Sequence, residues 1–177
     1  MKELGEKIVS YWGNRAEGYS EYNREELAGD KWQDWIAEIK KHLPKKEKSE
    51  IRILDIGTGP GFFAILLAQE GYQVTAVDCT AEMLTEAQEN AGVLAAQITW
   101  KQMDAQKLEF ADESFDLVLS RNLTWVLEEP KTAYQEWYRV LKPKGIMLNF
   151  DANWYRYLYD EEMRKAYEAD RAATEAN

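Results

Sequence analysis

The sequence is poor in the residues that hold metal ions and form covalent cross-links. Its 177 residues include one cysteine, Cys79, and one histidine, His42. A single cysteine cannot form an internal disulfide bond, which is typical of proteins from a reducing cytoplasm. One cysteine and one histidine also exclude the usual cysteine and histidine cages for zinc. We therefore expect a cytoplasmic protein without a metal site.

Long apolar runs and basic clusters are scarce as well. No segment approaches the roughly 20 uncharged apolar residues of a membrane helix, and the first residues, MKELGE, lack the apolar stretch of a secretory signal. The formal net charge is −10, whereas a polyanion needs clustered Lys and Arg to displace its counterions. The short lysine-rich stretches at 40–41 and 45–48 are explained by a solvated linker. We expect no nucleic-acid partner and no membrane partner.

What the sequence does contain is an alternation of strand-like and helical segments. Short apolar or β-prone runs predict strands at 51–56, 73–77, 98–103, 115–119 and 146–150. Between them, helical patterns cover 62–70, 81–91 and 132–141. This alternation predicts an α/β fold with a doubly wound, mainly parallel sheet of the Rossmann type. Right-handed crossovers would bring the carboxyl ends of the strands, and with them a ligand, to one edge of the sheet.

Two helical segments flank this alternating region. Residues 1–48 are expected to form an N-terminal helical lid, and residues 49–177 the ligand-binding core. Within the first segment an apolar helix face is predicted by the spacing of Trp32, Trp35, Ile36, Ile39 and Leu43. Pro44 is expected to end that helix. A charged helix is expected from Asp160 to the end of the chain.

A glycine-rich turn follows the first expected strand, in the segment Asp55-Ile-Gly-Thr-Gly-Pro-Gly61. A strand, such a turn and a helix bring bare backbone close to a ligand, because glycine has no Cβ atom. The dinucleotide fingerprint needs a small residue at position 62, where Phe62 stands. A carboxylate at Asp55 would repel a pyrophosphate but suits an ammonium group. The pattern favours a nucleotide-like ligand that carries an ammonium group and no phosphate.

Five segments in this order resemble the motifs of the class I, S-adenosylmethionine-dependent methyltransferases, in the branch that acts on small molecules: residues 53–62, 74–78, 102–105, 115–120 and 140–145. The resemblance covers roughly residues 50 to 150. It implies a Rossmann-like fold, S-adenosyl-L-methionine as cofactor, S-adenosyl-L-homocysteine as product and a small-molecule methyl acceptor. The segment from Tyr11 to Tyr19 also resembles the stretch that folds over the cofactor in small-molecule members, including those of quinone biosynthesis.

The resemblance assigns roles to particular residues. Asp78 would bind both ribose hydroxyls, although a helix N-cap, which Thr80 can also provide, is an alternative. Asp104 and Ala105 would meet the adenine, and Met83 would pack either on the adenine or in the core. Residues expected to contact the cofactor are Tyr11, Arg15, Tyr19, Asp55, Gly57, Thr58, Gly59, Gly61, Asp78, Cys79, Met83, Asp104, Ala105 and Arg121. Among these we expect the Cys79 thiol to be chemically inert.

The acceptor side is expected beyond the fourth and fifth strands. Asn122 and Trp125 are candidates to face the transferred methyl group, with an ordinary strand–helix connection as the alternative. Asp151, Trp154 and Tyr155 would form another wall or simply pack. Methyl transfer is an in-line displacement at an activated carbon, so positioning is the enzyme's main contribution and no obligatory catalytic residue is expected.

One departure from the family bears on activity and assembly. The family sheet has seven strands, whereas this sequence offers five and then a helix. We expect either a C-terminally truncated fragment or a sheet completed by another chain, with a homodimer through the open sheet edge. Two other functions stay open: a non-catalytic cofactor-binding domain or partner subunit, and a NAD-dependent oxidoreductase. Phe62 and the acidic residue Asp55 at the start of the glycine loop argue against the oxidoreductase.

Overall fold

A computed structural model describes residues 2–153 and 155–175. Three helices come first: α1 (Lys2–Gly13), α2 (Ala16–Ala28) and α3 (Trp32–His42). The strands are β1 (Arg52–Ile56), β2 (Gln73–Asp78), β3 (Ile98–Gln102), β4 (Phe115–Arg121) and β5 (Leu141–Phe150). The later helices are α4 (Phe62–Gln69), α5 (Ala81–Ala91), α6 (Pro130–Val140) and α7 (Glu161–Glu175). Short 3-10 helices are η1 (Lys48–Glu50), η2 (Gly92–Gln97), η3 (Thr124–Val126) and η4 (Arg156–Leu158).

The five strands form one parallel sheet in the order β3-β2-β1-β4-β5. The strand order reverses between β1 and β4, which is where ligands bind in doubly wound sheets. Asp55 on β1 is level with Ala76 of β2 on one side and Leu119 of β4 on the other. The predicted doubly wound, parallel α/β fold is confirmed. Within the described chain β3 and β5 are the edge strands.

Each face of the sheet has its own apolar core. One face packs against α3 and α4, with Ile39, Ile53 and Phe63 among its buried residues. The opposite face packs against α6, where Trp137 is fully buried. Helix α4 is apolar on all sides because it lies between α3 and the sheet, and seven of its residues are buried. The rigid sheet therefore holds the loops at its carboxyl edge in place.

Several predicted boundaries in the C-terminal half are wrong, including the end of β4 at Arg121 instead of residue 119. Helix α6 starts at Pro130 instead of residue 132, because proline at the first helical position loses no helical hydrogen bond. Strand β5 starts at Leu141 instead of Ile146 and runs through Pro143 and Gly145. A register irregularity opposite residues 115–117 and a left-handed backbone at Lys144 accommodate these residues in the edge strand.

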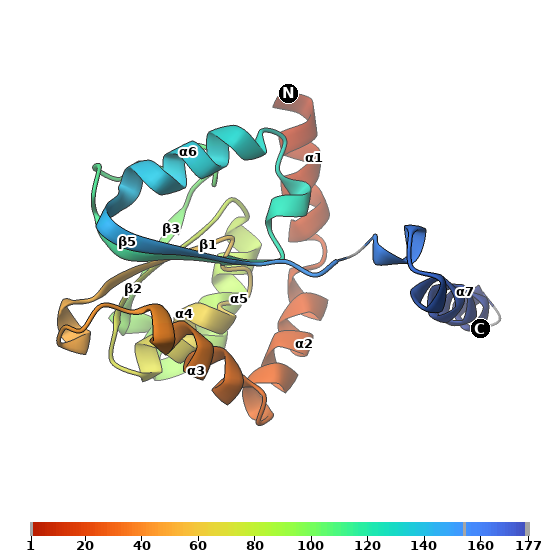
Figure 1. Cartoon of the computed structure of the whole chain (residues 1–177), viewed down its shortest axis with the longest axis horizontal. Helices are drawn as coiled ribbons and strands as arrows, with labels where there is room; N and C mark the ends of the chain where they lie inside the picture. The colour runs from red at the N-terminus through yellow and green to blue at the C-terminus, as the bar shows by residue number, and fades with distance from the viewer. Residues whose placement is uncertain (1, 154, 176–177) are drawn as a thin grey trace.

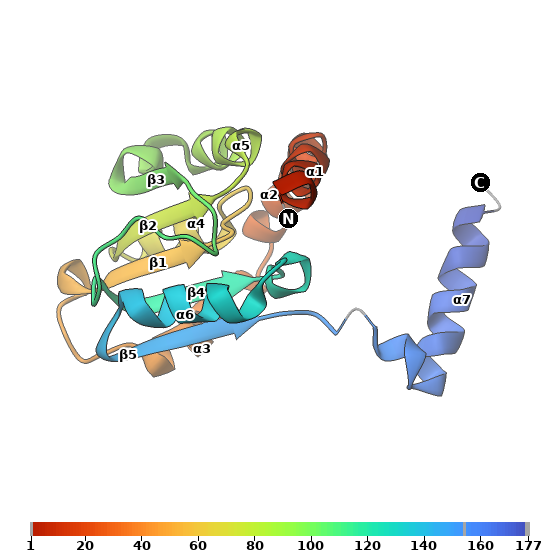
Figure 2. The ribbon, with the colours of Figure 1, turned by 90° about the horizontal axis from the view of Figure 1, so that it is seen from above.

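The N-terminal helices have two different locations. Helix α3 packs into the core beside α4, whereas α1 and α2 contact α5 and lie at the carboxyl ends of the strands (Figure 2). The helix predicted from the spacing of Trp32 to Leu43 is α3, and it ends before Pro44 as expected. The pocket described below is covered by α1 and α2, so these two helices are the ones in the position expected of a lid.

The last helix stands apart from the sheet. After β5 the chain runs outward, and α7 contacts η4, with the Tyr157 and Tyr167 rings stacked 4.1 Å apart (Figures 1 and 2). The helix expected from residue 160 onward is therefore present over the described residues 161–175; residues 176–177 lie outside them. Self-association through the β5 edge stays a prediction. None of the described helices is both long and apolar enough to cross a membrane.

Candidate functional site

A pocket of about 710 Å³ opens at the carboxyl edge of the sheet. Its volume falls within the range typical of ligand sites, roughly 300–1,000 Å³. Its walls are the glycine loop after β1, the ends of β2, β3 and β4, the η3 turn and helix α1. The residues of the predicted site that line it are Tyr19, Gly57, Gly59, Asp78, Cys79, Met83, Asp104, Ala105, Arg121 and Asn122.

The glycine loop forms the floor of this pocket. Gly57, Gly59 and Gly61 all have positive φ angles, of 65°, 52° and 93°. A Cβ atom on Gly57 would lie 2.8 Å from Leu123 Cδ1, and one on Gly61 would lie 3.1 Å from the Ala87 methyl group. Gly61 is outside the pocket lining and allows α4 to pack closely against α5. Only glycine fits this turn without strain.

The Asp55 side chain stabilises the glycine loop through hydrogen bonds. Its Oδ2 accepts hydrogen bonds from the Thr58 hydroxyl (2.7 Å) and from the Ala64 backbone N–H (3.1 Å). The side chain is buried, and it lines with Thr58 a small neighbouring cavity of about 40 Å³ beneath Tyr19 and Tyr22. Burial raises the pKa of the Asp55 carboxyl to about 7, against the lowering effect of the Thr58 and Ala64 hydrogen bonds.

Asp78, the last residue of β2, binds the glycine loop through a hydrogen bond. Its Oδ2 accepts a hydrogen bond from the Gly59 N–H (3.0 Å), and its Oδ1 accepts one from the Thr80 N–H (2.9 Å). Thr80 is the N-cap residue of α5 by position but forms no capping bond through its side chain. Burial raises the pKa of Asp78, and burial together with the Asp78 charge raises the pKa of the Cys79 thiol. The thiol is thereby held in its unreactive form.

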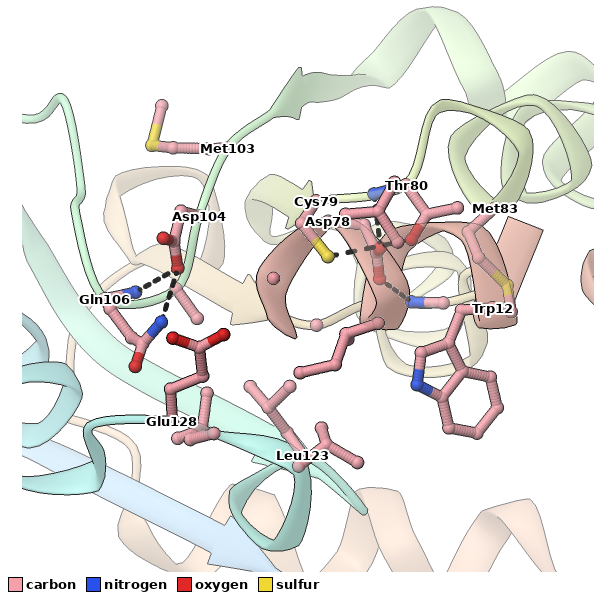
Figure 3. Close-up of a pocket in the computed structure, with 18 of the residues that line it drawn as sticks. Trp12, Asp78, Cys79, Thr80, Met83, Met103, Asp104, Gln106, Leu123 and Glu128 are labelled. Carbon is pink, nitrogen blue, oxygen red and sulfur yellow. Dashed lines mark hydrogen bonds between the residues drawn. The ribbon is translucent and has the colours of Figure 1, made fainter. Parts of the chain in front are cut away.

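Asp104 lies at the far end of the pocket, just after β3. Its Oδ1 accepts hydrogen bonds from the backbone N–H of Gln106 (2.8 Å) and from the side-chain amide of Gln106 (3.3 Å), as Figure 3 shows. The Ala105 carbonyl accepts a hydrogen bond from the Trp137 indole, which ties this loop to α6. Met83 is both buried and part of the lining, so the structure is compatible with either role proposed for it.

Arg121 ends β4 and joins the pocket to its cover. Its two terminal nitrogens donate to the two carboxylate oxygens of Glu26 on α2, at 2.9 and 2.7 Å. The guanidinium also lies over the rings of Phe62 (4.7 Å) and Trp35 (5.1 Å). Burial alone would lower the pKa of Arg121, but the hydrogen bonds and charge of Glu26 outweigh it and raise that pKa. The guanidinium is therefore already neutralised by a protein carboxylate.

The predicted N-terminal residues divide into two groups. Tyr19 lies over the glycine loop, where a Cβ atom on Gly59 would be 3.6 Å from its ring. Tyr11 and Arg15 are outside the pocket lining and stack on each other, with the guanidinium 4.0 Å from the ring centre. Trp12, beside Tyr11 in the sequence, lines the pocket instead (Figure 3).

Of the two predicted acceptor-side residues, one lines the pocket and the other does not. Asn122 lines the pocket with a positive φ of 55° and ties β4 to β5, because its N–H donates to the Phe150 carbonyl (2.8 Å). Trp125 is outside the lining and packs edge-on against Trp12, with ring centres 6.2 Å apart. Asp151 accepts a hydrogen bond from Thr124. Tyr155 is exposed, and Trp154 lies outside the described residues.

Sequence reasoning missed much of the apolar and acidic lining. The missed residues include Ile8, Val9 and Trp12 of α1 and Leu123, Val126, Leu127 and Glu128 around η3. The apolar α1 residues recur at helical spacing, which signals a buried face without saying what covers it. Glu128 and its neighbour Glu129 precede a proline, a pattern that indicates only the start of a helix.

Comparison with known proteins identifies the family to which this chain belongs. The family model described as "Methyltransferase domain" matches residues 54–149, more than half of the chain, from the glycine loop to β5. The chain belongs to the class I, S-adenosylmethionine-dependent methyltransferases. The matched segment carries the loop, Asp78, Asp104 and Arg121, whereas α1 and α2 lie outside it.

Among the relatives of this methyltransferase domain is the malonyl-acyl-carrier-protein O-methyltransferase of Erwinia billingiae, 30% identical over 80% of this chain and 51% of that protein. A solved phosphoethanolamine N-methyltransferase 2 of Haemonchus contortus, in complex with phosphomonomethylethanolamine and S-adenosylhomocysteine, is 36% identical over 63% of this chain and 26% of its own, with a TM-score of 0.56. The (4+2)-cyclase SpnF is 29% identical over 55% of this chain and 38% of its own, with a TM-score of 0.53. The chain spans about half the length of the curated relatives it matches.

Proposed function

We propose that this domain binds S-adenosylmethionine in the pocket at the sheet edge and transfers its methyl group to a small-molecule acceptor. The observation that carries the proposal is the charge of the lining. Glu6, Asp78, Asp104 and Glu128 contribute carboxylates, and the guanidinium of Arg121 is paired with Glu26. Such a lining suits a sulfonium with an ammonium group and disfavours the pyrophosphate of a dinucleotide.

The glycine loop and Asp78 fit this ligand as well. The Asp78 carboxylate is held in place by Gly59 and Thr80 and has further lone pairs for ribose hydroxyls. Asp104 lies across the pocket, where the adenine amino group is expected. Gly57 and Gly59 leave room for the methionine portion beneath Tyr19. All of the predicted cofactor contacts, those of Asp78, Asp104, Tyr11 and Arg15 included, stay predictions.

In this reaction the main contribution of the protein is to position the acceptor against the methyl group. When bound, the cofactor supplies a methyl group on a positively charged sulfur: the sulfur–carbon bond breaks as the acceptor–carbon bond forms, and the sulfur keeps the electron pair. Apolar residues of α1 and η3 line this region, so a bound ligand would displace water from it. Asn122, held between β4 and β5, presents a polar side chain beside the floor. A general base is needed only for an acceptor that arrives protonated.

Isothermal titration with S-adenosylhomocysteine tests the proposal, with NADH titrated into the same preparation. We expect micromolar binding of adenosylhomocysteine and no binding of NADH. Binding of NADH alone would instead favour an oxidoreductase, and binding of neither would reject the proposed site. A screen of oxygen and nitrogen nucleophiles with methyl-labelled cofactor then follows, because the names of the relatives include both an O- and an N-methyltransferase.

A binding-only role is the second candidate. It is favoured by the likeness to SpnF, a protein of this fold whose name describes a cyclase and not a methyltransferase. In that case adenosylhomocysteine binds and no acceptor turns over. Label transfer to any small molecule, absent from the Gly57→Val variant, would rule this candidate out.

A further inference from the structure

One carboxylate oxygen in the pocket, Glu128 Oε1, has no hydrogen-bond partner among the described residues. Glu128 lies between η3 and α6 and contributes to the pocket lining. Its Oε1 atom is buried, and no described residue donates a hydrogen bond to it. Leaving a charged acceptor buried and unsatisfied is costly, so such an atom calls for a donor from elsewhere. The guanidinium of Arg121, which also lines the pocket, is paired with Glu26.

Hydrogen bonds place this carboxylate at the Asp104 end of the pocket. The backbone N–H of Glu129, the next residue, donates to Gln106 Oε1 at 2.6 Å. The amide nitrogen of the same Gln106 side chain donates to Asp104 Oδ1 at 3.3 Å. This chain of contacts joins the two loops that carry the two acids. In Figure 3 the carboxylate of Glu128 points into the pocket from the side lined by Asp104 and Gln106.

Helix α1 shields the same atom from solvent. A Cβ atom built on Gly5 would lie 3.6 Å from Glu128 Oε1, so the oxygen is in contact distance of the covering helix. This oxygen has almost no solvent-accessible surface, so bulk water does not satisfy it. Glu128 as a residue lines the pocket, so a ligand that fills the pocket is the nearest source of an N–H or O–H for its carboxylate.

We propose that Glu128 is a second acceptor for the exocyclic amino group of the adenine, opposite Asp104. That amino group carries two hydrogens, so each carboxylate can accept one of them. The pair would make the pocket selective for a 6-aminopurine, because a substituent without two N–H hydrogens leaves at least one of the two carboxylates without its donor. This inference rests on the proposed function, since it presupposes the adenosyl ligand.

The test compares two ligands on three proteins by isothermal titration. The ligands are S-adenosylhomocysteine and its analogue with purine in place of adenine, which lacks the amino group. The proteins are wild type, Glu128→Ala and the control Glu129→Ala, whose side chain is exposed. Glu128→Ala should weaken adenosylhomocysteine binding about tenfold, the scale of a lost hydrogen bond to a charged group. Binding of the purine analogue should change less than about twofold, and Glu129→Ala should leave both affinities as in wild type.

Two further readouts separate recognition from a structural role. Glu128→Gln keeps an acceptor oxygen and should recover part of the preference for the amino ligand. Removing an unsatisfied carboxylate should leave the melting temperature of Glu128→Ala equal to or above that of wild type. Equal weakening of both ligands, or of neither, would overturn the role of Glu128 while leaving the proposed function intact. A wild-type protein that binds neither ligand would overturn both.

Discussion

The floor and the cover of the pocket are built in different ways. The floor consists of residues 55–61 with Asp78. The buried carboxylates of Asp55 on β1 and Asp78 on β2 accept hydrogen bonds from the Thr58 hydroxyl, the Gly59 amide and the Ala64 amide of α4. The cover, helices α1 and α2, is held through side chains: Ser20 to Asn90 (2.9 Å) and Glu26 to Arg121. Opening the floor would disrupt the sheet, whereas opening the cover breaks a few side-chain contacts. The cover is therefore expected to open at a lower free-energy cost than the floor.

The largest effect is expected from filling the floor at Gly57. Gly57→Val places a β-branched side chain at a positive φ and drives it against Leu123, which lines the pocket. Gly71→Val is the matched control, because Gly71 also has a positive φ (91°) but open space around it. Both variants should lose roughly 1–3 kcal/mol of folding free energy through backbone strain. Only Gly57→Val should abolish adenosylhomocysteine binding in titration; equal loss of binding in both would point to unfolding instead.

The second effect concerns the buried carboxyl under the floor. The pKa of Asp55 is raised to about 7 in the folded protein, so between about pH 4 and pH 7 the folded state retains a proton that the unfolded state releases. The stability contributed by this group therefore falls as pH rises through that window, by at most roughly 4 kcal/mol. Asp55→Asn removes the ionisation and should become more stable relative to wild type between pH 5 and pH 8.

Urea unfolding at several pH values measures this slope, and Asp116 supplies the control. Burial raises the pKa of Asp116, but hydrogen bonds from Lys142, Lys46 and the Arg52 N–H outweigh it and lower that pKa to about 2. Stability contributed by Asp116 is present above about pH 4 and is lost as pH falls toward 2. Asp116→Asn should therefore leave the slope between pH 5 and pH 8 unchanged. Parallel profiles for wild type and Asp55→Asn would contradict the prediction.

A smaller effect is expected where the floor meets the ligand. Asp78→Ala should weaken adenosylhomocysteine binding by roughly 2–3 kcal/mol, the scale of lost charge-assisted hydrogen bonds. The variant also loses the acceptor for the Gly59 and Thr80 amides, so its folding must be checked by thermal melting. Unchanged affinity in a folded variant would mean that Asp78 only braces the turn.

The smallest effect is expected in the cover. Glu26→Gln weakens the contact with Arg121 and should increase the opening of α2 by about 1 kcal/mol, or roughly fivefold in amide exchange. Amides of β1 should keep their protection, because the floor does not depend on this pair. The neighbouring Glu25→Gln, at an exposed position, is the control. If α2 exchanges at the wild-type rate in Glu26→Gln, the cover is held by its apolar contacts alone.

Local sequence signals were sufficient for most of the framework. Helix α5 has the predicted bounds of Ala81 and Ala91, since a Thr N-cap position and a following glycine mark its ends. The glycine loop was recognisable because its backbone geometry demands particular residues at particular positions. The start of β5 was not recognisable from the sequence, because an edge strand tolerates the proline and glycine that usually end a strand.

The sequence by itself therefore determined the fold and the location of the ligand-binding edge, because strand, turn and helix preferences depend on neighbouring residues. Only the tertiary structure decided which side chains face the pocket. Glu26 and Arg121 pair across 95 residues, Trp12 lines the pocket where Tyr11 was expected, and the Glu129 amide donates to Gln106. Such contacts follow from how helices dock on the sheet, and docking depends on the packing of the whole core and not on any local pattern.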